Sequence, residues 1–177
     1  MKVVLVFVSA IDGKVTKWGD SDVKKWSSGE DKEHFRKVWR DSKLIVMGSN
    51  SFEAENLKPS PDRLVLVLTH QPDKYANSKK EGQLEFTDES PVHLISRLKN
   101  EGFQQMTLLG GPKVATSFLK EELVDELWLT IEPVIFGTGE KLVSEEKLDF
   151  KLKLISAEKI NEQGTLILKY SIQRKKG

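Results

Sequence analysis

The sequence predicts an α/β domain with a mainly parallel central sheet and an antiparallel C-terminal edge. Up to Glu132, short apolar segments of strand length alternate with segments of helical pattern, which is typical of parallel strand–helix–strand units. After that point two alternating segments, 149–160 and 165–174, flank a polar turn over 161–164 and predict a β-hairpin. The chain has 177 residues and no low-complexity stretch, so residues 1–177 are predicted to form a single domain.

The predicted elements follow in order along the chain. Residues 3–8 form a continuous valine-rich run, the pattern of a strand buried on both faces. A polar loop follows over 9–29, and a loop of that length in a compact domain is usually functional. From Gly29 onward, acidic residues open a helix. The other predicted strands are 44–47, 63–69, 83–86, 106–109 and 126–132, and the other predicted helices begin at 48–51 and span 91–100 and 113–121. The basic segment 174–177 is predicted to be a solvated end.

Composition narrows the function classes. The net charge of +1 provides no basic field for nucleic acid or an anionic membrane, and no apolar stretch is long enough to span a bilayer. The chain has no cysteine, which excludes disulfides and cysteine-ligated zinc and fits a reducing cytoplasm. Its three histidines, His34, His70 and His93, share no ligand spacing, so no metal site is expected. A cytoplasmic protein that acts on a small molecule is therefore predicted.

Four polar or glycine-rich junctions follow the predicted parallel strands, at 9–15, 48–51, 69–71 and 110–113. Ligands of open α/β sheets bind beyond the C-terminal ends of the strands. In the last junction, Gly110 and Gly111 precede a helix, and glycine lets a backbone approach a pyrophosphate closely. For any one junction taken alone, the alternative interpretation is an ordinary tight turn. Together they predict an extended ligand of dinucleotide size.

An ordered set of motifs resembles the dihydrofolate reductase superfamily. The closest resemblance is to the reductase domain of the bifunctional riboflavin-biosynthesis deaminase-reductase, and it covers residues 2 to about 140. It implies the three-layer α/β fold of that superfamily. The motifs are Ser-Ala-Ile-Asp-Gly-Lys-Val at 9–15, Trp-Ser-Ser-Gly-Glu-Asp at 26–31 with His-Phe-Arg at 34–36, Val-Met-Gly-Ser at 46–49, Pro-Asp-Arg at 61–63 with 66–72, Leu-Gly-Gly at 109–111 and 125–131.

The resemblance implies NADPH as the cofactor. The matching positions are Gly48, Ser49, Ser51, Gly110 and Gly111 for the pyrophosphate, Thr69, His70 and Gln71 for the adenosine 2′-phosphate, and Lys113 for a charge-assisted contact. Ser49 replaces an arginine common in folate reductases, which weakens the prediction of NADPH over NADH. The alternative for Lys113 is an ordinary solvated lysine.

On the substrate side, the resemblance assigns the active-site carboxylate to Asp31 and the hydroxyl that binds it to Thr130. A carboxylate can accept two hydrogen bonds from the 2-amino–N3 edge of a pterin or aminopyrimidinone, and burial would make it a candidate proton relay. The further substrate-binding candidates are Ser9, Trp26, Phe35 and Arg63. The alternatives are that Asp31 only compensates the helix dipole and that the aromatic residues belong to the core.

The predicted function is an NADPH-dependent reductase of a small heterocyclic substrate, of the 5-amino-6-(5-phosphoribosylamino)uracil reductase type. Dihydrofolate reductase is the alternative enzyme, but the first loop lacks its Asn-Gly-x-x-Pro-Trp motif. A non-catalytic nucleotide-binding protein is the third reading, because Ala115 stands where such reductases place a tyrosine against the nicotinamide. The Ala-Asp-Asp-Pro stretch of riboflavin reductases is also missing after Gly48. The prediction allows a homodimer.

Overall fold

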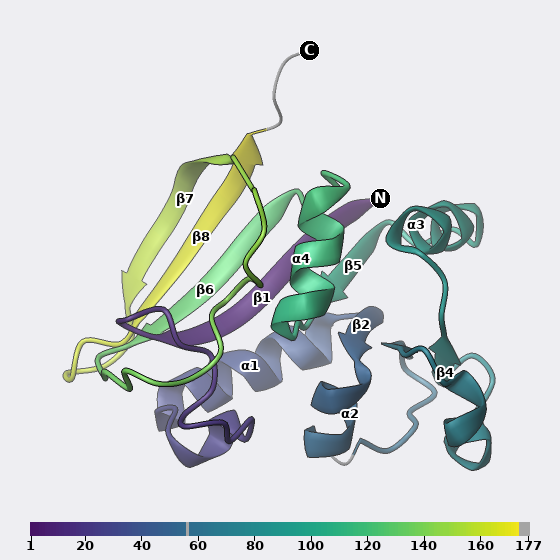
Figure 1. Cartoon of the computed structure of the whole chain (residues 1–177), viewed down its shortest axis with the longest axis horizontal. Coiled ribbons are helices and arrows are strands. Elements are labelled where there is room, and N and C mark those ends of the chain that lie inside the picture. The colour runs from purple at the N-terminus through teal and green to yellow at the C-terminus, as the bar shows by residue number, and fades with distance from the viewer. Residues whose placement is uncertain (56, 174–177) are drawn as a thin grey trace.

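The computed structural model describes residues 1–55 and 57–173, and within them eight strands form one sheet in the order β4-β3-β2-β5-β1-β6-β8-β7 (Figure 1). The strands are β1 (Lys2–Ala10), β2 (Leu44–Gly48), β3 (Leu64–Leu68), β4 (Leu84–Thr87), β5 (Gln105–Leu108), β6 (Glu126–Glu132), β7 (Lys151–Lys159) and β8 (Leu166–Gln173). The helices are α1 (Gly29–Asp41), α2 (Ser49–Glu55), α3 (Pro91–Asn100) and α4 (Pro112–Lys120), with short 3-10 helices η1 (Val23–Lys25) and η2 (Pro72–Ser78).

The strand directions confirm a mainly parallel sheet with an antiparallel C-terminal edge. β1 pairs in parallel with β5 and β6, and β2, β3 and β4 continue the parallel set. β8 then runs antiparallel to both β6 and β7. Six strands therefore end at the same edge of the sheet, where the predicted ligand-binding junctions lie.

Helices cover both faces of the sheet and make three layers. Val3 and Leu5 of β1 pack in one cluster with Phe118 of α4, together with residues of α3. Val4 of β1 instead packs with Val38 of α1 on the opposite face. This alternation follows from the period of two along a strand, and it requires apolar residues at every β1 position that the helices cover. The predicted three-layer architecture is confirmed.

The β7–β8 hairpin forms the end of the sheet opposite β4 (Figure 1). Every residue of β7 is exposed, whereas its turn returns to the body of the protein near the start of α1. Asn161 of that turn directs its side-chain nitrogen at the Glu30 carboxylate, 3.4 Å away. The hairpin thereby brings a distant part of the sequence to the region of Asp31.

The first loop is more ordered than its polar composition suggests. β1 continues to Ala10, and η1 lies inside the predicted loop. The segment that follows β6 holds the rest in place: Val15 donates its backbone N–H to the Glu140 carbonyl at 2.9 Å. Short 3-10 turns such as η1 and η2 have no 3.6-residue periodicity to find in a sequence. The predicted solvated segment 174–177, and the last residue of the predicted strand 165–174, lie outside the described residues.

Candidate functional site

The two glycine-rich junctions that follow β2 and β5 meet at the C-terminal edge of the sheet. The Gly48 N–H donates to the Gly110 carbonyl at 3.2 Å, and the Ser51 hydroxyl donates to the same carbonyl at 3.4 Å. The peptide bond between Gly110 and Gly111 is cis. Residues far apart in the sequence thus meet at one place, where Gly110 is buried and Gly48, Ser51 and Gly111 are half-buried.

The two glycines differ in what surrounds them. A Cβ added at Gly110 would lie 2.3 Å from the ring of Phe7, and the residue has a φ of +41°. A Cβ added at Gly111 would meet no atom closer than the Ser51 Oγ, 3.9 Å away, and the φ of Gly111 is −63°. Gly110 is therefore required by packing and conformation, whereas the space in front of Gly111 is open to a ligand.

The predicted 2′-phosphate residues lie further along the same edge. Thr69 follows β3, and its hydroxyl accepts the backbone N–H of Gln71 at 3.2 Å. His70, Gln71 and Lys113 are exposed. β3 is two strands away from β5, which places Thr69 about 10 Å from the glycine pair across the sheet. That spacing suits the two ends of a nucleotide.

Asp31 is buried, with 5 % of its surface exposed, in the first turn of α1. Ser28 caps this helix, and its hydroxyl accepts the Asp31 backbone N–H at 3.1 Å. Burial raises the pKa of Asp31, and the nearby Glu132 carboxylate adds to the increase, while hydrogen bonding to Thr130 and the proximity of Ser27 and Lys32 partly oppose it. An acid that only compensated a helix dipole would face solvent, so the burial favours a functional role.

The predicted aromatic residues surround the same helix start. Phe35 lies one helical turn after Asp31, on the same face of α1, and is half-buried. Trp26 packs edge-on against Phe136 with ring centroids 4.9 Å apart. Its indole nitrogen is buried and has no hydrogen-bond partner in the structure. A buried N–H without a partner is costly and is a donor available to a ligand or water.

Of the other two predicted substrate-binding residues, Ser9 lies beside Thr130, whereas Arg63 lies away from Asp31. Ser9 is buried on β1 opposite Ile131 of β6, beside Thr130. Arg63 precedes β3 and lies at the other end of α1, where its guanidinium donates to the carbonyls of Trp39 and Ser42. The structure therefore does not bring Arg63 together with Asp31: its Nη1 donates to local helix-end carbonyls, while its buried Nε has no hydrogen-bond partner.

Asp12 and Trp18 hold the first loop against the segment after β6, whose Phe136 packs on Trp26. The Asp12 carboxylate accepts the backbone N–H groups of Phe136 and Gly137, at 3.3 and 2.7 Å. Trp18 is 70 % exposed and donates its indole N–H to the Phe136 carbonyl. Glu132 is a second buried acid close to Asp31. The sequence shows an acidic residue two positions after Thr130, but no local pattern indicates that this residue is buried.

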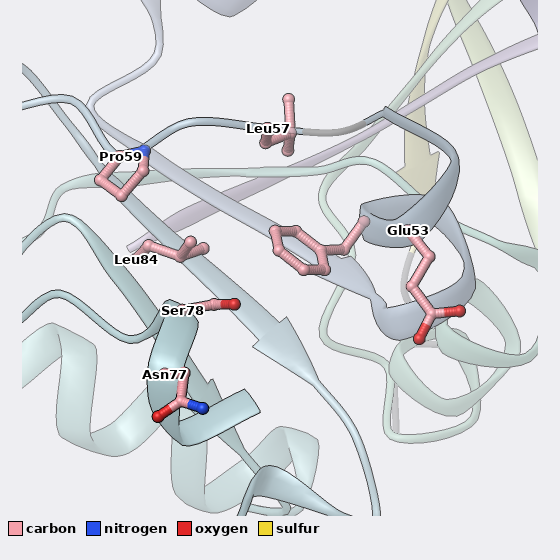
Figure 2. A pocket seen from close by; sticks show the side chains of 7 residues that line it. Glu53, Leu57, Pro59, Asn77, Ser78 and Leu84 are labelled. Carbon is pink, nitrogen blue, oxygen red and sulfur yellow. The ribbon is translucent and has the colours of Figure 1, made fainter. Parts of the chain in front are cut away.

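Two surface hollows lie outside the group of residues around Asp31 and the Gly110–Gly111 turn. The hollow in Figure 2 is about 410 Å³ and lies against α2, η2 and β4; the labelled Glu53, Leu57 and Leu84 are part of its lining. None of the predicted site residues lines it. A polar hollow of about 510 Å³ lies between Glu30 and the β7–β8 turn, next to the start of α1. In residues 1–55 and 57–173, no three metal-ligating side chains gather, and no helix is long and apolar enough to cross a membrane.

Comparison with known proteins identifies the family. The family model of the RibD C-terminal domain matches residues 1–166, so the chain belongs to the RibD C-terminal domain family. The uncharacterized protein YwjB of Bacillus subtilis is 27% identical over 158 residues, which cover 86% of this chain and 88% of YwjB.

Solved structures show the fold. One is the diaminohydroxyphosphoribosylaminopyrimidine deaminase/5-amino-6-(5-phosphoribosylamino)uracil reductase of Thermotoga maritima, with a TM-score of 0.74 and 18% identity. The match covers 97% of this chain and 56% of that one. Dihydrofolate reductase from Enterococcus faecalis, complexed with NADP(H), matches with a TM-score of 0.64 and 19% identity over 98% of this chain and 97% of that one. The fold is that of dihydrofolate reductase.

Proposed function

We propose that this protein is an NADPH-dependent reductase of a small heterocyclic substrate, of the 5-amino-6-(5-phosphoribosylamino)uracil reductase type. The observation that carries the proposal is the buried Asp31, close to Thr130 at the same edge of the sheet as the Gly110–Gly111 turn. Membership of the RibD C-terminal domain family supports the reaction class.

The glycine-rich edge fits a dinucleotide. Backbone at Gly111 has open space in front of it, and Ser51 and Gly48 line the same cradle. Lys113 in the first turn of α4 adds a positive charge near this space. Bound NADPH would supply the hydride, and the protein would supply orientation and exclude water.

Asp31 would recognise the substrate ring through its carboxyl oxygens. These can accept the N3–H and 2-amino donors of a pterin, or the N3–H of a uracil ring. Burial raises the pKa of Asp31 above its ordinary value, as expected for a group that handles a proton in a binding site.

The chemistry then needs one proton for each hydride. The hydride adds to the carbon of a carbon–nitrogen double bond, and a proton must reach the nitrogen to give the amine. With the uracil derivative a water molecule beside Asp31 would deliver this proton, whereas with dihydrofolate, whose ring nitrogen water reaches poorly, Asp31 itself would relay it. The unpartnered Trp26 N–H would hold such a water or a substrate oxygen, and the fastened first loop would keep bulk solvent out.

Dihydrofolate reductase is the second candidate, favoured by Phe35 lying one turn after Asp31 as a surface for a pterin ring. Ala115 favours the third, a non-catalytic nucleotide-binding protein, because it is fully buried in the core and offers no side chain to a nicotinamide.

The test is NADPH oxidation by the purified protein with 5-amino-6-(5-phosphoribosylamino)uracil and with dihydrofolate, side by side. We expect turnover of the uracil derivative to exceed that of dihydrofolate. The reverse preference would establish the folate enzyme. NADPH binding without oxidation on either substrate would establish the non-catalytic protein.

A further inference from the structure

Glu132 is a buried acid that the proposed reaction does not use. It ends β6, two residues after Thr130, and only 3 % of its surface is exposed. Both carboxylate oxygens have a short hydrogen bond. One accepts the backbone N–H of Ser28 at 2.7 Å, and the other accepts the hydroxyl of Thr165 at 2.7 Å. Both bonds join segments far apart in the sequence, so Glu132 connects the end of β6 to the start of α1 and to the residue that follows the β7–β8 turn.

The first of these bonds leads directly to Asp31. Ser28 is the N-cap of α1, with extended backbone at φ −65° and ψ 165°, and its hydroxyl accepts the Asp31 N–H at 3.1 Å. By holding the Ser28 N–H, Glu132 fixes the residue from which α1 begins. The orientation of the Asp31 side chain depends on that starting point.

The second bond leads to the turn of the β7–β8 hairpin. Thr165 is fully buried, and its hydroxyl accepts the side-chain N–H of Asn161 at 2.8 Å while it donates to Glu132. The side-chain oxygen Oδ1 of Asn161 in turn accepts the backbone N–H groups of Gly164 and Thr165, at 3.0 and 2.9 Å. Each donor in this network has an acceptor, and a fully satisfied buried polar network is rigid.

We propose that Glu132 is a positioning residue: it fixes the Asp31 carboxyl through Ser28 and fastens the β7–β8 turn to the same point. The proposal rests on the role of Asp31 in the proposed function. Glu132 also acts on Asp31 through its charge, because a nearby negative charge disfavours the ionised form of Asp31 and raises its pKa. Thr130, Ser27, Lys32 and Glu132 are the groups that act on the Asp31 carboxyl.

Three substitutions separate the hydrogen bonds from the charge. Glu132→Gln keeps an acceptor for the Ser28 N–H and offers an amide donor to Thr165, but it removes the charge. Glu132→Ala removes both bonds and leaves the Ser28 N–H without its partner. Thr165→Val removes only the link to the hairpin. Glu126→Gln is the matched control, because Glu126 lies on the same strand and pairs with Lys2 instead.

The Asp31 titration is measured by carboxyl carbon NMR of the intact chain, assigned with Asp31→Asn, and the KM and kcat of each variant are measured beside it. We expect Glu132→Gln to lower the pKa of Asp31 and leave the substrate KM within about threefold, whereas Glu132→Ala raises the KM about tenfold or more. The KM of Thr165→Val should lie between the KM values of Glu132→Gln and Glu132→Ala. Glu126→Gln should change neither quantity.

The NMR titration does not depend on turnover, so it remains informative if the proposed reaction is wrong. An Asp31 titration in Glu132→Gln that is identical to that of Glu126→Gln would overturn the proposal. So would a KM for Glu132→Gln as poor as that of Glu132→Ala, because the conservative variant would then have failed to rescue the position. If Glu132→Ala does not fold, Glu132→Gln and Thr165→Val still decide the matter.

Discussion

The adjacent glycines Gly110 and Gly111 should differ in how far the same substitution to alanine changes the stability of the protein. In Gly110→Ala the new methyl group would lie 2.3 Å from the Phe7 ring, in a residue with a φ of +41°. Overpacking costs about 1–3 kcal/mol and the left-handed conformation about 1–2 kcal/mol more, so we expect a loss of about 2–5 kcal/mol in the free energy of unfolding. In Gly111→Ala the methyl group would enter open space at an allowed φ of −63°. The free energy of unfolding should then change by no more than about 1 kcal/mol.

The cofactor separates the two variants further. NADPH at one hundred times its Kd stabilises a folded protein by about 2.7 kcal/mol, which raises the Tm of a chain of this size by about 5–11 °C. Gly111→Ala should lose most of this increase, because its methyl group occupies the space that the cofactor phosphate would need. The assay is thermal unfolding monitored by circular dichroism, with and without NADPH. Equal increases in Tm for wild type and Gly111→Ala would refute the placement of the phosphate.

Two further predictions concern charged groups of the site. His70→Ala combined with Lys113→Ala should weaken the binding of NADPH more than that of NADH by about 1–3 kcal/mol, measured by titration calorimetry; equal weakening would remove both residues from 2′-phosphate recognition. Asp31→Asn should gain stability over wild type as the pH rises. The folded-state pKa of Asp31 is raised, so the stability that its protonated form contributes is complete below the unfolded pKa and is lost as the pH rises through the folded pKa. Denaturant unfolding of both proteins across this pH range measures the difference, and parallel pH profiles would contradict it.

The sequence predicted what depends on local pattern. The alternation of apolar segments and helices, the hairpin, and the glycine junctions all follow from spacing within a few residues, and the structure has each of them. Asp31 could be selected because its distance from Trp26 and Phe35 matches a family motif. Its burial could not be predicted from that spacing, because burial depends on β6 and the first loop.

The residues that the sequence missed have distant partners. Glu132 bonds Ser28 across 104 positions and Thr165 across 33, so no local pattern marks it. Arg63 is the opposite case: a family motif selected it, but its Nη1 donates to the carbonyls at the end of α1, away from Asp31. Tertiary contacts decide whether a polar side chain binds a ligand or the protein itself.

The central claim is that a substrate ring binds against Asp31, and the kinetics of Asp31→Asn test it most directly. With the uracil derivative we expect the KM to rise about tenfold or more while kcat stays within about tenfold, because the residue mainly orients the ring. With dihydrofolate, whose ring nitrogen depends on a buried proton donor, turnover should fall by about 10²–10⁴-fold. Unchanged KM and kcat on every accepted substrate would show that Asp31 is only a buried acid at the start of a helix.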